Sequence, residues 1–337
     1  MSRSETDNDI VLSTRFRLAR NLHGWKFIST MSEEEIERLN RVFSKEIQSN
    51  PVYRDFTVYK IDDLDELDRI VLKERKFISE RFYRKGSGLV AIDEPRQTSI
   101  VTGDLDHIRI SSFTEGLAVE PVMKRTFAIE EALAERYNFA MDGENGYLTA
   151  NISDSGSAAK ASVFLHLPVL SASDLMDHLI INTIETNLEV TGFDGGGTQS
   201  LGGLYIISTR NGSFVGGNEA GQLEKAASLF ARYERDARED LLDGRYPILE
   251  DRIFRSYGLL RYCRQISEQE ALSALSLVRL GAAIDWFKDL SLDDFPEIFR
   301  SIGNGFLRSF AYESNPDEND IMRLRAETIR KGLNFNL

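Results

Sequence analysis

An apolar segment that carries three arginines constrains the fold of this chain more than any other feature. Residues 10–21 read Ile-Val-Leu-Ser-Thr-Arg-Phe-Arg-Leu-Ala-Arg-Asn, which is apolar enough to be half-buried. If this segment is a β-strand, its side chains alternate between two faces, so Arg15 and Arg17 point the same way. Two adjacent guanidinium groups suit a phosphate or a carboxylate. The alternative is a strand whose polar face carries two solvated arginines.

Length and charge limit the kinds of protein that this chain can be. A chain of 337 residues with 42% hydrophobic residues supports one large domain or two smaller ones. The net charge of -13 argues against general binding to nucleic acid or to an anionic membrane, so any basic site must be local. The longest apolar stretch, residues 163–170, is too short to cross a bilayer, and no signal-peptide pattern precedes residue 10. The expected location is the cytoplasm.

The sequence gives no spacing typical of a metal site. Cys263 is the only cysteine, which excludes an internal disulfide, and the four histidines are scattered along the chain. We therefore expect no structural metal ion bound by the protein itself.

Periodicity and turn residues predict an α+β fold with a largely antiparallel sheet flanked by helices, because the expected strands cluster in the middle of the chain. Helices are expected at residues 32–48, 118–137, 172–187, 219–243, 267–283 and 318–333. Strands are expected at residues 52–61, 88–93, 98–102, 106–112, 162–168, 187–193 and 203–215.

Local signatures refine three of these elements. Ser32 with Glu35, and Ser267 with Glu270, have the spacing of capping boxes at helix starts. Asn211-Gly212 predicts a hairpin turn within the last strand. The glycine-rich stretch 192–203 either approaches a ligand closely or forms a mobile loop, and it lacks the Gly-Lys-Ser/Thr of a P-loop.

Five segments stand out in order along the chain: Ser13–Asn21, Asp106–Ile110, Gly146–Thr149, Ala161–Pro168 and Glu250–Gly258. Together they resemble the successive motifs of ATP:guanidino phosphotransferases, the phosphagen kinase family, and above all its bacterial protein-arginine kinases. The resemblance implies a guanidino kinase catalytic domain over residues 9–245. It also implies a helical C-terminal region over residues 246–337, like that of protein-arginine kinases.

The resemblance implies a site for ATP with Mg²⁺, whose γ-phosphoryl group is transferred to a guanidinium nitrogen. Arg15, Arg17 and Arg109 match the arginines that hold the phosphates, whereas Lys160 replaces a fourth arginine and lacks its bidentate fork. Lys76 matches a histidine that packs near the base. The remaining nucleotide-binding positions implied by the two motifs are Ser13, Thr14, Phe16, Ala161, Ser162, Val163 and Phe164.

The positions that would hold and deprotonate the acceptor guanidinium depart from the family pattern. The family has carboxylates and a cysteine where this chain has Leu105, Asn151, Gly196 and Gln199. A guanidinium has a pKa above 12 and is a poor nucleophile without such groups. If residues 104–109 form a regular strand, Leu105 shares a face with Arg109, and Asp104 and Asp106 point to the other face. Asp104, Asp106 or Asp154 would then need a rearrangement to act as substitutes.

A C-terminal segment matches the family's phosphoarginine-binding pattern in part. Asp320 and Arg323 occupy matching positions one helical turn apart, but Asn319 replaces an arginine. The pair would bind the guanidinium and phosphate of phosphoarginine, or it is an ordinary i,i+3 pair on a helix.

Two classes of function follow from the sequence. The first is an ATP-dependent phosphotransferase acting on arginine in a protein. The second is a weak or inactive relative that regulates by binding nucleotide, a phosphoarginine protein or partner proteins. The resemblance implies as partners a second copy of the chain in a homodimer, a zinc-binding activator protein and a Clp-type chaperone.

Overall fold

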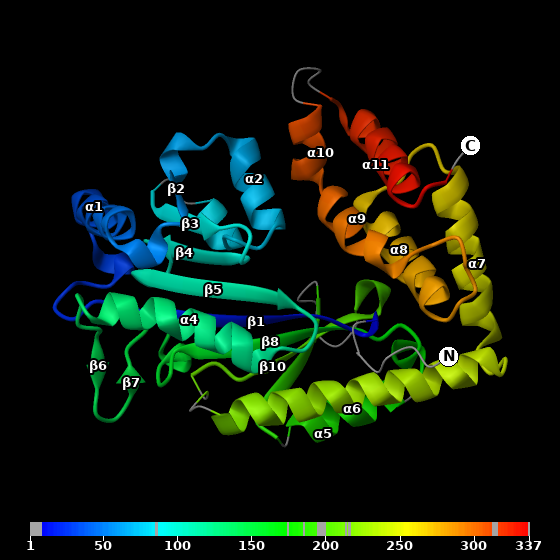
Figure 1. Ribbon diagram of the computed structural model, residues 1–337, viewed down its shortest axis with the longest axis horizontal. Helices are drawn as coiled ribbons and strands as arrows, with labels where there is room; N and C mark the ends of the chain where they lie inside the picture. Colours follow the sequence, from blue (N-terminus) through cyan, green and yellow to red (C-terminus); the bar gives the residue numbers. More distant parts are fainter. Residues whose placement is uncertain are drawn as a thin grey trace.

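The computed structural model describes residues 9–84, 87–173, 175–184, 186–193, 200–212, 214, 217–311 and 316–335. These residues form an eight-stranded antiparallel sheet in the order β2-β3-β4-β5-β1-β8-β10-β9, as well as a two-stranded ribbon (Figure 1). The strands of the large sheet are β1 (Val11–Arg20), β2 (Thr57–Lys60), β3 (Leu89–Asp93), β4 (Thr98–Thr102), β5 (Ile108–Glu115), β8 (Ala159–His166), β9 (Leu188–Gly192) and β10 (Leu204–Thr209). The ribbon pairs β6 (Met141–Asp142) with β7 (Gly146–Tyr147). The expected α+β class with an antiparallel sheet is confirmed.

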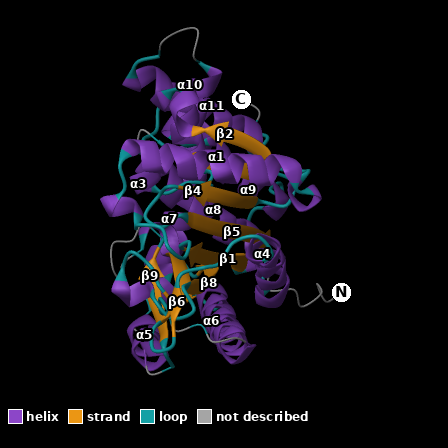
Figure 2. Cartoon of the chain, turned by 90° about the vertical axis from the view of Figure 1, so that its left-hand side faces the viewer, coloured by secondary structure: helices purple, strands orange, loops and turns teal. Residues whose placement is uncertain are grey.

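One face of the sheet is apolar and covered by helices. Phe16 and Leu18 on β1 and Val163 on β8 are buried in a core that also takes residues from α4, α5 and α6. A second core packs α1 and α4 against β3, β4 and β5. These helices are α1 (Glu33–Ser49), α4 (Val119–Ala134), α5 (Leu175–Ile184) and α6 (Gly217–Leu242). Figure 2, in which the strands run through the middle of the molecule, shows α4 and α6 on one side of them.

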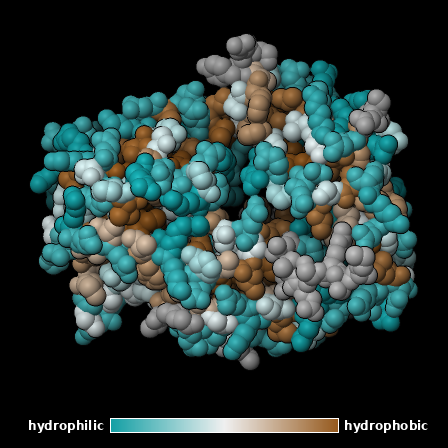
Figure 3. Space-filling model, viewed as in Figure 1, coloured by the Kyte–Doolittle hydropathy of each residue, from teal (hydrophilic) through white to brown (hydrophobic). Residues whose placement is uncertain are grey.

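The opposite face of the sheet is covered only in part. Over β3 and β4 it is closed by α2 (Glu66–Glu74), α3 (Glu80–Tyr83) and an apolar cluster that includes Phe77 and Phe82. At the other end stand the C-terminal helices α7 (Pro247–Tyr262), α8 (Glu268–Ala283), α9 (Phe295–Ser301), α10 (Asn304–Phe310) and α11 (Glu318–Gly332). The part between them stays accessible, and Figure 3 shows the surface hollowed there. None of the described helices is long and apolar enough to cross a membrane.

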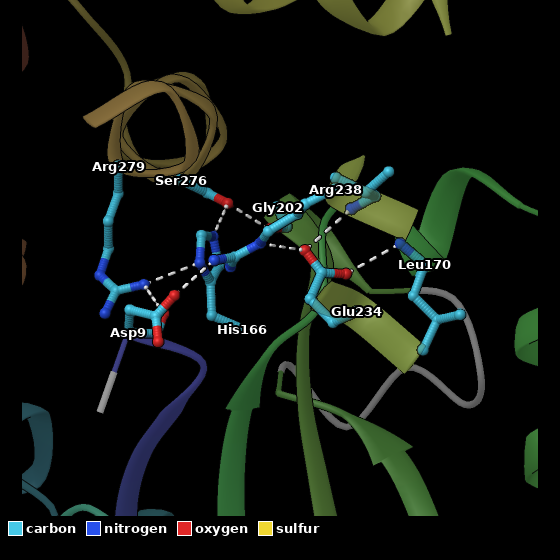
Figure 4. A network of polar contacts seen from close by, with 9 residues as sticks. Asp9, His166, Leu170, Gly202, Glu234, Arg238, Ser276 and Arg279 are labelled. Carbon is cyan, nitrogen blue, oxygen red and sulfur yellow. Dashed lines mark hydrogen bonds and ion pairs between the residues drawn. The ribbon is translucent and has the colours of Figure 1, made fainter. Parts of the chain in front are cut away.

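A buried polar network joins the C-terminal helices to the sheet (Figure 4). Arg279 on α8 donates from Nη1 to the backbone oxygen of Asp9 at 2.7 Å and to Nδ1 of His166 at 2.8 Å. Nε2 of His166 lies 2.8 Å from the hydroxyl of Ser276, which itself donates to the carbonyl of Gly202. The Ser276 proton is thereby used, so Nε2 of His166 must carry the ring proton and Nδ1 must accept. His166 is therefore neutral in this network.

The same network extends to α6 through two more buried charges. Arg238 donates to Glu234 at 2.9 Å and to the carboxylate of Asp9 at 2.6 Å. Glu234 also accepts from the backbone N–H of Leu170 at 2.9 Å. Burial raises the pKa of Glu234, and burial together with Arg279 and Arg238 holds the pKa of His166 well below its usual value. This network forms the joint between the sheet and the C-terminal helices. Its charged groups stabilise one another only while the sheet and these helices remain packed together.

Several expected elements differ from the structure. The Ser32 and Glu35 capping box is confirmed, whereas at α8 Ser267 accepts from Glu270 N–H without the reciprocal bond. The helix expected over 172–187 is shorter, and the expectations omitted α2, α3, α7, α9 and α10. The Asn211-Gly212 hairpin is wrong: β10 ends at Thr209, and the next element in the described chain is α6. Gly212 instead packs on a loop, because its carbonyl accepts from the N–H of Ser157 and a Cβ there would lie 2.0 Å from the Ser155 oxygen.

Candidate functional site

Three neighbouring strands bring four cationic side chains to the open face of the sheet. Arg15 and Arg17 alternate with the buried Thr14, Phe16 and Leu18, so they share a face as expected. Lys160 on β8 is paired with Arg17, and Arg109 on β5 is paired with Ala19. Residues paired directly across antiparallel strands lie on the same face, so all four cations converge.

The two central arginines of this group, Arg15 and Arg17, have no carboxylate partner in the part of the chain that the structure describes. Among the described residues neither Arg15 nor Arg17 forms a hydrogen bond or ion pair with a carboxylate, and the buried Nε of Arg15 has no hydrogen-bond partner there. Burial, followed by repulsion from Arg17 and Arg109, holds the pKa of Arg15 well below its usual range. Burial and Arg109 lower the pKa of Arg17 to about 10, although the nearby charges of Asp154 and Glu189 oppose the shift. Buried cations without partners are costly, and a bound anion would remove that cost.

Aromatic rings flank the cluster on one side. The guanidinium of Arg15 lies 5.6 Å from the ring centre of Phe113 and 5.3 Å from that of Phe164. The Lys76 ammonium lies 5.1 Å from the ring centre of Phe193. These cation–π contacts hold the side chains in place without neutralising them.

The cluster opens into a cavity of about 570 Å³, a volume usual for a small-molecule site. Arg15, Arg17 and Arg109 line it from strands β1 and β5 of the sheet. The other lining residues are Ile70, Lys73, Glu74, Lys76, Ile78, Ser79, Glu80, Ser111, Glu268 and Asn304. Glu268 and Asn304 belong to the C-terminal helices, so this cavity lies between the sheet and those helices.

A smaller cavity of about 210 Å³ shares Arg17 and Arg109 with the larger one. Its wall also holds Lys160, Leu105 and three carboxylates, those of Asp104, Asp106 and Asp154. Lys160 forms an ion pair with Glu189, and Nη1 of Arg109 lies 2.7 Å from Oδ2 of Asp104. The cations of the smaller cavity are therefore largely neutralised by the protein.

The expected alternation of residues 104–109 is wrong. β4 ends at Thr102, β5 begins at Ile108, and residues 103–107 form the bend between them, starting at Gly103 with a φ of 79°. Asp104 consequently reaches Arg109 and accepts from the Ser79 hydroxyl at 2.9 Å, with its Oδ1 buried and unpartnered. Asp106 accepts from Nδ2 of Asn21 at 2.7 Å and from the N–H of Ala150 at 2.8 Å, so it fixes loops rather than a ligand.

The other acceptor-side positions lie on loops. Asn151 is exposed, and its Nδ2 donates to Asp154 at 3.3 Å. One oxygen of Asp154, Oδ1, is buried without a partner. Gly196 and Gln199 lie outside the described residues.

Four residues expected at the nucleotide point away from the cavity. The side chains of Thr14, Phe16, Ala161 and Val163 are buried on the helix-covered face, and Thr14 donates to the carbonyl of Gly116. Ser13, Ser162 and Phe164 share the face of Arg15. Strand alternation permits only every second residue of a motif to reach the site.

Asp320 and Arg323, which were expected to bind phosphoarginine, form an exposed ion pair. Nη1 of Arg323 lies 3.5 Å from Oδ1 of Asp320 on the surface of α11, with side-chain exposures of 64% and 53%. Glu74, Ser79, Glu189, Glu268 and Asn304 border the cavities or their cations and were missed by the sequence analysis. No local pattern marks them, because each reaches the site through packing of distant segments.

Comparison with known proteins identifies the family. Residues 38–231 match the ATP:guanido phosphotransferase C-terminal catalytic domain. The chain belongs to the ATP:guanido phosphotransferase family. Residues 247–336 match the protein-arginine kinase McsB C-terminal domain. A protein-arginine kinase of Bacillus licheniformis is 32% identical over 99% of this chain and 92% of its own length. One from Bacillus subtilis is 31% identical over 100% of this chain and 93% of its own length.

Solved structures of other ATP:guanido phosphotransferases share the fold. Substrate-free duplicated taurocyamine kinase from Schistosoma mansoni has a TM-score of 0.57 at 23% identity, covering 69% of this chain and 35% of that chain. Lombricine kinase has a TM-score of 0.58 at 19% identity, covering 72% of this chain and 70% of that chain. At these identities the likeness concerns the fold alone.

Proposed function

We propose that this chain is an ATP-dependent phosphotransferase that acts on arginine side chains of proteins, with slow turnover. The observation that carries the proposal is the buried group of Arg15, Arg17 and Arg109, in which Nε of Arg15 has no partner. Guanidinium forks at the edge of a nucleotide-sized cavity suit a triphosphate. The curated relatives named protein-arginine kinases support arginine in a protein as the acceptor.

Mg²⁺ would arrive bound to the phosphates of ATP. The described residues contain no group of three or more His, Cys, Asp or Glu side chains placed to hold a metal ion. Mg²⁺ commonly binds through substrate phosphates and water, so the arginine-lined cavity fits MgATP without a carboxylate cage. When bound, Mg²⁺ neutralises charge on the phosphates.

The smaller cavity is the proposed acceptor site. In the transfer a guanidinium nitrogen of the acceptor bonds to the γ-phosphorus, the bond from that phosphorus to the β–γ bridging oxygen breaks, and ADP leaves. The guanidinium must also lose a proton, and Asp104 and Asp154 line this cavity with one buried carboxylate oxygen each that has no hydrogen-bond partner among the described residues. Arg17 and Arg109 border both cavities and hold the phosphoryl group between them.

Slow turnover follows from the composition of that acceptor cavity. Leu105 presents an apolar side chain beside the acceptor, and Asp104 is already engaged by Arg109 and Ser79. Removing one positioned acid or base typically costs about 10² to 10⁴ in rate. A nucleotide-binding regulator without turnover is the second candidate, and it is favoured by the same Leu105 beside an intact arginine group.

The partners and location rest on the resemblance. We propose a homodimer in the cytoplasm that works with a zinc-binding activator protein and a Clp-type chaperone. A phosphoarginine protein, as ligand rather than substrate, belongs to the regulator alternative.

The deciding experiment incubates the purified chain with labelled MgATP and an arginine-rich protein. Acid-labile, base-stable phosphate on the protein at a rate well below about 1 s⁻¹ is the expected result. The matched control replaces every arginine of the substrate by lysine and should remain unlabelled. Nucleotide binding without any labelling would instead support the regulator.

A further inference from the structure

The larger cavity is lined from two sides. Arg15, Arg17 and Arg109 line it from strands β1 and β5 of the sheet, whereas Glu74, Glu268 and Asn304 line it from helices α2, α8 and α10. Lys73 and Lys76 also border the cavity. A triphosphate is repelled by carboxylates and attracted by guanidinium groups. The phosphates of a nucleotide therefore belong beside the arginines of the sheet, and its uncharged nucleoside beside the helices that carry the carboxylates.

The three glutamates that line this cavity differ in the hydrogen bonds and ion pairs that they form. Glu74 accepts from the backbone N–H groups of Gly305 and Phe306 at 2.7 and 2.9 Å. Glu80 is paired with Lys73 at 3.1 Å and with Arg84 at 2.9 Å. Glu268 forms no hydrogen bond or ion pair through its side chain within the described parts of the chain, and it is half-buried. Its carboxylate is thus the one left available to a ligand.

Burial destabilises the charged form of the Glu268 carboxylate. It is the main cause that raises the pKa of Glu268, and Glu74 adds to the shift, whereas Arg325, Lys73 and Lys76 oppose it. A carboxylate in this condition gains from hydrogen-bond donors that carry no charge of their own. The two hydroxyls of a ribose are such donors, and carboxylates accept readily from them.

A buried arginine binds the two segments that carry Glu268 and Asn304 to the wall of the cavity. Arg325 on α11 is 1% exposed and donates to the carbonyls of Ile266 at 3.0 Å and Ile302 at 2.8 Å. It also donates to Oδ1 of Asn304, which directs the amide N–H groups of that side chain elsewhere. Glu268 follows Ile266 by two residues and Asn304 follows Ile302 by two. The donor and the acceptor at the cavity wall are therefore positioned from one point.

We propose that the C-terminal helical region completes the nucleotide site, with the Glu268 carboxylate accepting from the ribose hydroxyls of ATP and Arg325 acting as a positioning residue behind it. The inference rests on the proposed function, since it needs ATP in the larger cavity. It adds that nucleotide recognition is shared between the sheet and the C-terminal helices. Specificity for a ribonucleotide over a bare polyphosphate then comes from α8 and not from the sheet.

The test removes the Glu268 carboxylate and the ribose hydroxyls separately and together, and compares the changes in binding free energy. The wild-type chain, Glu268→Ala and Glu270→Ala are titrated by calorimetry with MgATP, with the Mg²⁺ complex of 2′,3′-dideoxy-ATP and with magnesium triphosphate. Glu270 is the matched control, because it is an exposed acid in the same first turn of α8 and its removal costs the same helix-dipole interaction. Thermal unfolding of all three proteins checks that they fold alike.

Glu268 either binds the ribose or is only a nearby negative charge, and these two explanations predict opposite changes in MgATP affinity for Glu268→Ala. If Glu268 binds the ribose, Glu268→Ala weakens MgATP about 10-fold, leaves the dideoxy nucleotide unchanged within about twofold, and leaves triphosphate equal or tighter. If Glu268 is only a nearby negative charge, its removal tightens all three ligands alike, which would overturn the inference. Equal binding of ATP and its dideoxy analogue by the wild-type chain would also overturn it. Failure of the wild-type chain to bind any of the three would contradict the proposed function itself, and the inference with it.

Discussion

The two cavities share Arg17 and Arg109 but differ in how the protein treats their charges. In the larger cavity Arg15 and Arg17 have no carboxylate partner among the described residues, and the guanidinium groups repel one another. In the smaller cavity Asp104 pairs with Arg109, Glu189 pairs with Lys160, and Leu105 adds an apolar wall. The first cavity is prepared for an anion, whereas the second is close to neutral before any ligand enters.

The supporting backbone explains why the two cavities differ. The arginines and Lys160 stand on β1, β5 and β8, whose register fixes their direction. The altered acceptor positions that the structure describes, Leu105 and Asn151, lie in a bend and beside a short 3₁₀ turn. Loops tolerate substitutions that strands at the centre of a sheet do not. The cationic side chains are therefore held by the sheet itself, whereas the altered acceptor positions depend on loops.

The largest expected effect comes from rebuilding the acceptor side. Leu105→Glu, Gly196→Glu and Gln199→Glu together with Asn151→Cys should raise acid-labile phosphorylation by about 10² to 10⁴, because they supply the acids and the thiol that activate a guanidinium. Leu105→Glu alone should do little, since groups of one site act as a unit. The measurement is the initial rate with labelled MgATP and an arginine-rich protein.

The control for this rebuilding carries Leu105→Gln with the same three other changes, which keeps the shape but removes the charge. Equal rates for the two quadruple variants would show that the carboxylate at position 105 is not the missing group. Turnover of about 1 s⁻¹ or more by the unmodified chain would reverse the comparison and leave Asp104 or Asp154 as the working acid.

Arg109→Ala should damage both cavities at once. It removes one phosphate fork and leaves the buried carboxylate of Asp104 without its ion-pair partner. Truncating one partner of a buried charge pair typically costs about 2–5 kcal/mol, so MgADP affinity should fall 30-fold or more. The thermal stabilisation by millimolar nucleotide should then disappear.

Arg41→Ala is the matched control for this loss, because Arg41 is an exposed arginine in an i,i+4 pair on α1. It should leave the nucleotide-induced shift intact. A shift that survives Arg109→Ala would mean that the arginines of the sheet are structural and that neither cavity is a phosphate site.

The larger cavity also depends on the joint that holds the C-terminal helices, and this joint should respond to pH. Burial, Arg279 and Arg238 depress the pKa of His166, so the folded chain binds this proton more weakly than the unfolded chain does. Stability is then present above the unfolded value near 6.5 and is lost as pH falls below it. Between pH 7.5 and 5.5 this histidine should reduce the free energy of unfolding by roughly 1 kcal/mol.

His166→Gln should be less stable than the wild-type chain at pH 7.5 but should lose less stability on acidification. Denaturant titrations at the two pH values measure the difference. His107, whose pKa burial also lowers, contributes to both proteins and cancels from the comparison. His23→Gln, at an exposed position, should keep the full pH dependence. An unchanged slope in His166→Gln would show that His166 titrates normally.

Local patterns in the sequence predicted the parts of the fold that local chemistry determines. Ser32 with Glu35 located the start of α1, and strand alternation placed Arg15 and Arg17 on one face. Alternation failed at Leu105 because Gly103 ends β4 with a positive φ and the chain turns there. Glycine and aspartate are typical of turns, so Gly103, Asp104 and Asp106 do mark this bend, and the strand expected from residue 106 begins two residues later, at Ile108.

Local sequence patterns could not predict which residues of the C-terminal helices line the larger cavity. Glu268 reads as an ordinary first-turn acid of a helix, and Asn304 as one more polar residue. Their place in the site depends on Arg325 and on the packing of α10 against α2, which no spacing along the chain encodes. Sequence reasoning finds a site within one sheet more easily than a site closed by a distant segment.

The smallest expected effect concerns the exposed pair on α11, which lines neither cavity. A peptide with phosphoarginine should bind no more than about twofold better than its unphosphorylated twin, because Asn319 removes one phosphate fork and the remaining pair of Asp320 and Arg323 is solvated. Arg323→Ala should change this ratio no more than Lys331→Ala does, Lys331 being in an equally exposed pair on the same helix. The measurement is fluorescence anisotropy of the two labelled peptides at low salt, where surface electrostatics is strongest.

A preference of 10-fold or more that Arg323→Ala abolishes would establish α11 as an anion site. Arg15, which has no carboxylate partner among the described residues and lines the larger cavity but not the smaller, would then not be needed to bind phosphate in this protein.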